Sequence, residues 1–550
     1  MVGILSFLGF TILVGVIAYL ATRTTDETSS DGYFLGGRSL TAGVIAGSLL
    51  LTNLSTEQIV GLNGSAYKDG LSVMAWETLA AIAMVVTAMF LLPRYLKEGL
   101  TTVPQFLAKR FDVATKTITS GLFLTGYVVV LLPVILYSGS VAISGMFDVP
   151  TLLDVSDNTA LVICIWGIGI IGSIYAVFGG LKAVVVSDSI NAIGLIVGGI
   201  LIPVFGLMAI GDGSVLQGLD TLVSANPERF DSTGEPGQEV PFSTIFTGMM
   251  LVQLFYWGTN QQIIQRALGA KNLAEGQKGL LLASFLKILG PLILVLPGMI
   301  AYYYFEGGLA SSDLAYPELV RAVLPKPLVG FFAAVLFGAI LSSFNSVLNS
   351  SVTLFGIDIY KQHINPEAPE RTVVKYGKIF GICLALAAMF IAPLIKDAGS
   401  LFNYLQEING IYSIPIFTII VIGYLTKRVP AIAAKIGIFS GSILYIISQF
   451  IVGPHLTENA LEAAKAAGIT DPVELGLVEA EAYPHYLHVM AILFVLNMLI
   501  MLIIGKIWPR KEPFVLEYSK QVDIKPYRYV NQVGIAVCLI VIGIYIYFAK

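Results

Sequence analysis

Polar residues interrupt the apolar stretch at residues 44–67, VIAGSLLLTNLSTEQIVGLNGSAY. The interruption is the run TNLSTEQ, which includes Asn53 and Gln58, and hydrophobic residues stand on both sides of it. Lipid cannot hydrogen-bond to such a segment, so it persists at membrane depth only inside a protein or beside a wet cavity. A broken helix of this kind frees carbonyls and helix ends that can bind a cation and a polar solute. The alternative is a helix packed deep in a bundle, with its polar groups bonded only to neighbouring helices.

A second interruption lies in the run at residues 245–266, which contains LVQLFYWGTNQQIIQR. Gln253, Tyr256 and Gly258 stand here in a segment that is otherwise apolar enough to span a membrane. This run begins five runs after the first broken one. Because five is odd, two five-helix units would enter the membrane from opposite sides, which is the inverted-repeat arrangement of secondary transporters.

Hydroxyl and amide residues gather on the long run at residues 328–358, in the segment GAILSSFNSVLNSS. Ser342, Ser346 and Ser350 recur at every fourth position and therefore share one helix face. Several oxygen ligands without excess charge suit a hard cation such as Na⁺. The same small residues would also suit a helix-packing face, and the pattern does not decide between the two.

Glu77, Asp188 and Lys287 are charged residues inside apolar runs. A charge at membrane depth is costly, so each residue should face a partner or water. Glu77 and Lys287 have opposite charges and could neutralise each other. The alternative to a functional role is a purely structural ion pair.

The composition is that of an all-α polytopic membrane protein, because 56% of the residues are hydrophobic, 12% are charged and the mean hydropathy is +0.81. The net charge of −4 gives no reason to expect nucleic acid as a partner. The three cysteines lie inside apolar runs and show no metal-binding spacing. About fourteen spans are expected, at residues 2–21, 40–62, 72–93, 117–145, 158–178, 184–211, 242–265, 279–305, 328–358, 378–395, 400–425, 431–453, 486–505 and 530–549.

These spans form one transmembrane domain over residues 1–550. It would consist of a leading helix at 2–21, a first repeat at 40–211, an inverted second repeat at 242–425 and three trailing helices at 431–550. If the N-terminus lies outside, the inward connections carry 24 of the 32 Lys and Arg residues, with Lys116 and Arg266 among them. By the positive-inside rule, we expect a multi-pass protein of the cell (inner) membrane with both termini outside the cytoplasm.

Several longer motifs in register resemble the solute:sodium symporter family, and most closely its sodium/glucose (galactose) cotransporter branch. The motifs, from about residue 30 to 430, are DGYFLGGRSL, NLSTEQIVG, YAVFGGLKAVVVSD, YWGTNQQIIQRALGAKN, AILSSFNSVLNSSVTLFGIDIYK and NYLQEINGIYS. The resemblance implies a LeuT-type fold, in which the five-plus-five inverted repeat has one helix before it and three after it. It also implies Na⁺ as the coupling ion.

The family's site residues carry over by position. The resemblance implies a Na⁺ site from three backbone carbonyls and two hydroxyls, those of Leu51, Leu54, Ala339, Ser342 and Ser343. It implies sugar contacts from Asn53, Gln58, Glu77, Gln253, Tyr256, Lys287 and Gln406. Tyr256 would be the floor that blocks inward escape, and the outer lid would be Leu62, Trp76 and Phe402.

Three positions depart from the family's pattern. Gln253 stands where the galactose symporter has Asn, and Ala80 stands where it has Ser, so the particular sugar stays open. Members that use a second sodium carry Ser or Thr where this chain has Asn345. Asp188 and Ser346 remain beside it as candidates for a second Na⁺ or for the ion path, so the number of sodium ions also stays open.

A sodium-coupled importer of a galactose- or glucose-like monosaccharide is therefore the expected function. A sugar presents hydroxyls and no charge, which suits Gln, Asn, Glu and Lys above an aromatic floor. The runner-up is a sodium symporter for another solute, such as inositol or an organic anion.

An enzyme is not expected, because neither H-E-x-x-H nor G-x-S-x-G occurs. A channel or a transporter-like sensor would share the fold, but an occluding Tyr256 suits alternating access better. One monomer should suffice for transport.

Overall fold

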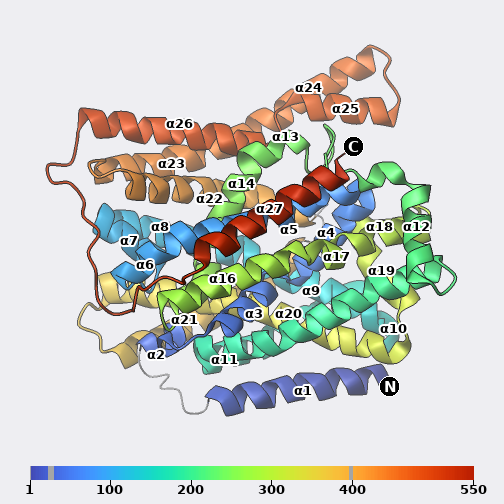
Figure 1. The fold of residues 1–550 in the computed structure, drawn as a ribbon, viewed down its shortest axis with the longest axis horizontal. Coiled ribbons are helices and arrows are strands. Elements are labelled where there is room, and N and C mark those ends of the chain that lie inside the picture. Colours follow the sequence, from blue (N-terminus) through green and yellow to red (C-terminus); the bar gives the residue numbers. More distant parts are fainter. Residues whose placement is uncertain (1, 23–29, 396–400, 550) are drawn as a thin grey trace.

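The computed structural model describes residues 2–22, 30–395 and 401–549, and the described part is a bundle of helices (Figure 1). The main helices are α1 Val2–Thr22, α2 Ser30–Leu35, α3 Ala42–Asn53, α4 Thr56–Asp69, α5 Ala75–Val86, α6 Leu92–Glu98, α7 Val103–Arg110, α8 Val113–Gly126, α9 Leu132–Phe147, α10 Val149–Leu153, α11 Asp157–Ile210, α12 Val215–Ala225, α13 Phe242–Thr244, α14 Met250–Gly258, α15 Gln261–Leu268, α16 Leu273–Ile288, α17 Gly290–Leu294, α18 Leu296–Tyr304, α19 Ala315–Val323, α20 Lys326–Thr353, α21 Glu370–Ile391, α22 Leu401–Leu425, α23 Ala431–Ile447, α24 Gly453–Ala466, α25 Pro472–Ala482, α26 Tyr486–Ile507 and α27 Val530–Phe548. Short 3₁₀ or π-helical segments join many of them: η1 Gly36–Arg38, η2 Gly70–Met74, η3 Thr87–Leu91, η4 Tyr127–Leu131, η5 Pro227–Phe230, η6 Ile245–Met249, η7 Ser312–Leu314, η8 Leu354–Ile364, η9 Ala392–Ile395 and η10 Ser448–Val452.

Ten helices of the described residues are long and apolar enough to cross a membrane, or eleven if the bent pair of α16 and α17–α18 is one span. Not all of the fourteen predicted spans therefore meet this criterion of length and apolar composition. The runs at 40–62 and 242–265 are divided into shorter helices at their breaks, and only Phe7–Ile17 of α1 counts as apolar helix. The bend of 48° follows α16 at Gly290 and Pro291, where proline removes a backbone donor.

The predicted spans at 158–178 and 184–211 are both present, as Asp157–Ile174 and Val184–Ile210 within α11. The segment ENALEAAKAAG begins within α24, and α25 follows that helix.

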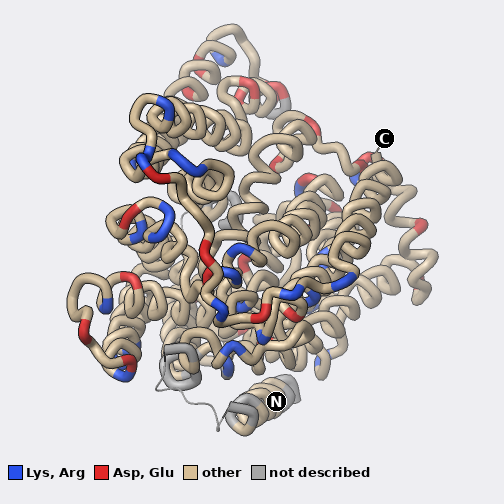
Figure 2. Tube along the Cα trace, turned by 60° about the vertical axis from the view of Figure 1, so that its left-hand side comes forward, with Lys and Arg blue, Asp and Glu red and all other residues tan. Residues whose placement is uncertain are grey.

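The start of α1 and the end of α27 lie at the same end of the bundle as α12 and α25, opposite the end that carries α2 and α7 (Figure 1). The α2 and α7 end comes forward in Figure 2, where Lys and Arg residues gather on it. This arrangement agrees with an even number of crossings.

The first broken helix lies at the centre of the packing. Its first half, α3, packs against α11, α15, α16 and α20, and its second half, α4, packs against α9, α18 and α19. The leading helix α1 packs on α11 and α20, whereas α23 and α26 pack on α22. The described residues contain one isolated β-bridge, in which Leu40 before α3 pairs with Ala270 after α15. This bridge joins one end of the first broken helix to one end of the second.

Candidate functional site

The first predicted break is confirmed at Leu54 and Ser55, between α3 and α4. Leu54 has ψ 57° and Ser55 has ψ 177°, so neither residue continues the helix. The Ser55 N–H donates to Asn53 O at 2.8 Å instead of to Leu51 O, its partner in a continuous helix. The break therefore frees the Leu51 carbonyl, which is one of the proposed sodium ligands.

The second predicted break is also confirmed, at Thr259 and Asn260 between α14 and α15. The Asn260 side chain caps α15 by accepting a hydrogen bond from Gln262 N at 3.3 Å. The same oxygen accepts a hydrogen bond from Tyr127 Oη at 2.6 Å. The two broken helices meet where Asn53 Nδ2 donates to Tyr256 Oη at 3.4 Å.

A cavity of about 60 Å³ lies between the two breaks. Five of the seven predicted sugar contacts line it: Asn53, Gln58, Gln253, Tyr256 and Gln406. Small-molecule pockets usually have roughly 300–1,000 Å³, so the side chains close tightly around this space. A solute of sugar size needs them to move apart.

Gln253 has both ends of its amide engaged. Its Nε2 donates to Trp76 O at 2.8 Å, and its Oε1 accepts from Trp257 Nε1 at 3.1 Å. Gln253, which is one methylene longer than Asn, therefore links α14 to α5 by a hydrogen bond. This hydrogen bond positions the Trp76 backbone at the cavity wall.

The remaining two predicted sugar residues, Glu77 and Lys287, form a buried ion pair behind the cavity. Lys287 Nζ donates to both carboxylate oxygens of Glu77, and both side chains are buried. Gln58 Nε2 donates to Glu77 Oε1 at 3.2 Å, which connects the pair to the cavity wall. A Cβ at Gly290 would clash with Glu77 Oε2, so glycine is required beside the pair.

The predicted sodium residues lie where α20 meets the first break. Ser343 Oγ donates to Thr52 O at 3.1 Å, next to the freed Leu51 carbonyl. Ser342 Oγ is buried without a hydrogen-bond partner. Leu54 and Ala339 are also buried. The contact of Ser343 with Thr52 brings the predicted hydroxyls of α20 to the broken backbone. Whether these five groups bind Na⁺ stays a prediction.

We expect Ser343→Ala to raise the sodium concentration for half-maximal uptake several-fold, because it removes one oxygen of about five. The matched control is Ser351→Ala on the same helix, since Ser351 Oγ bonds only to Val347 O at 2.8 Å. Sodium titrations of both variants in proteoliposomes check this. Unchanged sodium dependence in inserted Ser343→Ala would argue against the site.

Asp188 and Ser346, the candidates for a second ion, are joined through Arg266. Ser48 Oγ donates to Asp188 Oδ2 at 2.7 Å and accepts from Arg266 Nε at 3.1 Å, while Arg266 Nη2 donates to Ser346 Oγ. The prediction that Arg266 lies in an inward connection is wrong, because its side chain is fully buried at the end of α15. Asn345 is buried with an unpartnered Oδ1. A second Na⁺ remains undecided.

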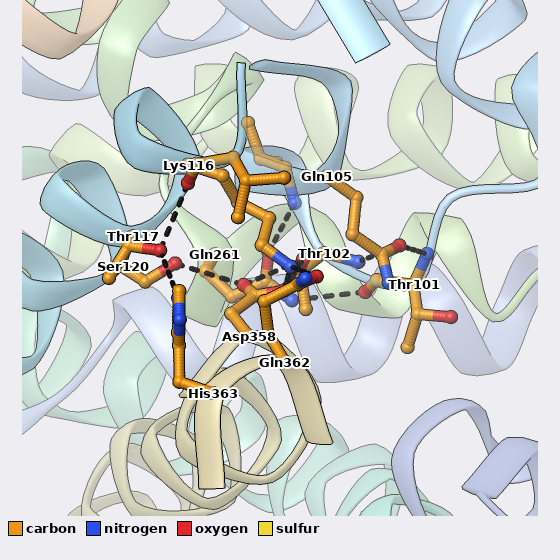
Figure 3. Close-up of polar contacts among 12 residues, drawn as sticks. Thr101, Thr102, Gln105, Lys116, Thr117, Ser120, Gln261, Asp358, Gln362 and His363 are labelled. Carbon is orange, nitrogen blue, oxygen red and sulfur yellow. Dashed lines mark hydrogen bonds and ion pairs between the residues drawn. The ribbon is translucent and has the colours of Figure 1, made fainter. Parts of the chain in front are cut away.

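Lys116 was also counted with a connection, whereas the structure buries it against Asp358 (Figure 3). Lys116 Nζ lies 3.5 Å from Asp358 Oδ1, and Asp358 accepts hydrogen bonds from Thr102 Oγ1 at 2.9 Å and from Ser120 Oγ at 3.0 Å. Gln261 of α15 accepts from Val103 N at 2.9 Å. The cluster thus ties α7, α8 and α15 to η8, the continuation of α20.

We expect Thr102→Val and Ser120→Ala each to cost about 1.5–3 kcal/mol, because each removes a hydrogen bond to a buried charged group. Thr125→Val is the matched control, since Thr125 is exposed and bonds only to Gly121 O of its own helix. Apparent melting temperatures in detergent check this. Equal melting of all three variants would show that the cluster does not stabilise the fold.

The structure places two of the four predicted gate residues at the cavity. Trp76 and Tyr256 line the cavity, whereas Leu62 is buried on α4 and is not part of the lining. Phe402 belongs to α22, but its side chain lies outside the described residues.

Five residues with carboxylate, amide or serine side chains line the cavity without having been predicted: Glu57, Asn260, Gln262, Asn409 and Ser413. All five lie inside motifs quoted for the family resemblance. Gln406, Asn409 and Ser413 are spaced by three and then four residues, so a helical period could have identified this face of α22.

Known proteins with similar sequences are membrane symporters. The chain is 45% identical over 543 residues to the uncharacterized symporter YidK of Escherichia coli, covering 98% of this chain and 90% of that protein. It is 32% identical to the sodium/glucose cotransporter of Vibrio parahaemolyticus, covering 80% and 83% of the two chains. It is 29% identical to the human sodium/myo-inositol cotransporter 2, covering 79% and 68%.

The fold is similar to that of a solved Na⁺-coupled sialic acid symporter, with a TM-score of 0.69 over 94% of this chain and 99% of that one, at 16% identity. The structure of Mhp1, a nucleobase-cation-symport-1 transporter, matches with a TM-score of 0.52 over 86% and 95%. These similarities show a LeuT-like fold. The profile of the Sodium:solute symporter family matches residues 33–444, and the chain therefore belongs to this family of transporters and is not an enzyme.

Proposed function

We propose that this symporter imports a neutral monosaccharide, galactose- or glucose-like, together with Na⁺ by alternating access. The observation that carries the proposal is the cavity between the two breaks, whose polar lining consists of amides, hydroxyls and one carboxylate beside aromatic rings. Sugar hydroxyls can satisfy such groups, and the Tyr256 ring can stack on the apolar face of a pyranose. The 32% identity to a sodium/glucose cotransporter supports the same class of substrate.

The coupling ion would bind one side of this cavity. Its ligands would be the carbonyls of Leu51, Leu54 and Ala339 and the hydroxyls of Ser342 and Ser343. The contact of Ser343 with the broken backbone at Thr52 supports this assignment. Binding of Na⁺ would hold α20 against the first break and so favour one arrangement of the helices around the solute.

A polyol such as inositol is the second candidate, because the same neutral lining would accept it and a myo-inositol cotransporter is among the relatives. An organic anion is less suited to the site. No Lys or Arg lines the cavity in the described part of the chain, and the nearby Lys287 is paired with Glu77.

The proposed location is the cell (inner) membrane, with both termini outside the cytoplasm. The support is the bias of Lys and Arg residues toward one set of connections, which holds 22 of the 32 when the buried Lys116 and Arg266 are left out and includes the connections that follow α1, α6 and α26. The 40–211 and 242–425 repeats would rock against each other around the cavity.

Uptake into proteoliposomes tests the substrate class. Labelled galactose, glucose, myo-inositol and an organic anion such as lactate would be compared under an inward Na⁺ gradient. We expect at least one neutral solute to accumulate, and the organic anion to stay at the level of protein-free vesicles. Accumulation of lactate alone would contradict the proposal.

A further inference from the structure

Glu57 is a buried carboxylate in the cavity that the sequence motif did not assign to the site. It lies in the first turn of α4, just after the break, and is 8% exposed. Its Oε2 atom has no hydrogen-bond partner, although its side chain lines the cavity. A buried unsatisfied acceptor is costly, so this oxygen requires a donor from water or from a solute.

Three further acceptors in the same lining are unpartnered: Asn53 Oδ1, Gln262 Oε1 and Ser413 Oγ, each on a buried side chain. Their chemistry is less restrictive than that of Glu57. An amide can turn its NH₂ group toward a solute, and a hydroxyl can donate as well as accept. An ionised carboxylate offers acceptors only, so Glu57 alone among the four demands donors.

The place of Glu57 in the first turn of α4 offsets part of the cost that burial imposes on its ionised form. The N-terminus of a helix carries partial positive charge, which stabilises an anion in the first turn. Because Lys287 is paired with Glu77, no described cationic side chain of the lining neutralises Glu57. When Glu57 is ionised, the cavity has a local negative charge directed at the solute.

We propose that Glu57 is the specificity-determining residue that selects neutral polyhydroxylated solutes and rejects acidic sugars. Its two oxygens accept hydrogen bonds from neighbouring solute hydroxyls, and charge-assisted bonds of this kind are strong. A uronic acid would bring a second carboxylate into a small low-dielectric space, where like charges repel. The inference rests on the proposed function, and it identifies Glu57 as the residue that makes the site prefer neutral sugars to acidic ones.

The test uses matched solutes that differ only at C6: glucose with glucuronate, and galactose with galacturonate. Each is measured as a competitor of the labelled neutral solute that the parent transporter carries with Na⁺. In the parent, each uronate should compete at least about tenfold more weakly than its neutral counterpart. In Glu57→Gln, affinity for the neutral sugar should fall about tenfold, and the preference over the uronate should largely disappear.

Two further variants separate charge from structure. Ser413→Ala removes an uncharged acceptor from the same cavity, so it should weaken binding of the neutral sugar and keep the preference. Glu57→Asp keeps the charge and should also keep the preference, which leaves the test decisive if Glu57→Gln fails to insert. A parent-like preference in Glu57→Gln, or its loss in Glu57→Asp, would overturn this inference alone. A parent that carries no neutral solute with Na⁺ would instead overturn the proposed function.

Discussion

Lys287→Met should abolish sodium-driven uptake and lower stability by about 3–5 kcal/mol. Both members of the pair are buried inside the bundle, so the variant leaves the Glu77 carboxylate without its counter-ion. Gln58 bonds to the same carboxylate and lines the cavity, so a displaced Glu77 also disturbs the solute site. Uptake in proteoliposomes and thermal unfolding in detergent measure the two effects.

The double variant Glu77→Gln with Lys287→Met separates folding from transport. Replacing both members of a buried pair is often nearly neutral for stability, so the double variant should recover much of the lost stability. It should not recover uptake, because the Gln58 contact has changed. Arg321→Met is the control, since Arg321 and Glu318 form an exposed pair worth about 0–1 kcal/mol. Normal uptake by Lys287→Met would show that the pair is not part of the transport site.

Tyr256→Ala should lose sodium-coupled accumulation, whereas Tyr256→Phe should keep much of it. The ring lines the cavity and packs edge-on against Trp257, with 5.2 Å between the ring centroids, so Tyr256→Phe retains the floor of the site. The Tyr256 hydroxyl accepts a long hydrogen bond of 3.4 Å from Asn53 Nδ2. Stacking of a sugar on an aromatic face contributes about 1 kcal/mol, and the larger role of the ring is steric.

The measurement compares sodium-driven accumulation with sodium-free equilibration of the same sugar in the same vesicles. Tyr256→Ala should show weaker binding, or a leak of sugar that does not depend on Na⁺. If it accumulates sugar as well as the parent does, Tyr256 is not the floor of the site.

Hydropathy and polar interruptions were sufficient to predict both breaks and the helical bundle. The breaks are local features, because TNLSTEQ and GTNQQ place hydrogen-bonding residues where a spanning helix would need apolar ones.

The polar contacts of the site were harder to predict, since they join residues far apart in the chain. Glu77 and Lys287 were paired correctly because two opposite charges in a membrane need partners. Arg266 and Lys116 were misplaced because each lies near a helix end, where a basic residue usually faces water. Glu57 was missed because the motif alone does not show which of its polar side chains faces a cavity.

Reciprocal coupling tests the central claim most directly, namely that Na⁺ and a neutral solute move together through the site between the two breaks. One Na⁺ crossing ~100 mV gains about 2.3 kcal/mol, and a tenfold gradient adds about 1.4, which permits roughly 500-fold accumulation. The coupling must also run in reverse. With equal Na⁺ on both sides and no voltage, an inward gradient of the transported sugar should drive labelled Na⁺ into the vesicles, and Ser343→Ala should weaken this flux. Sugar entry without any movement of Na⁺ would contradict the account.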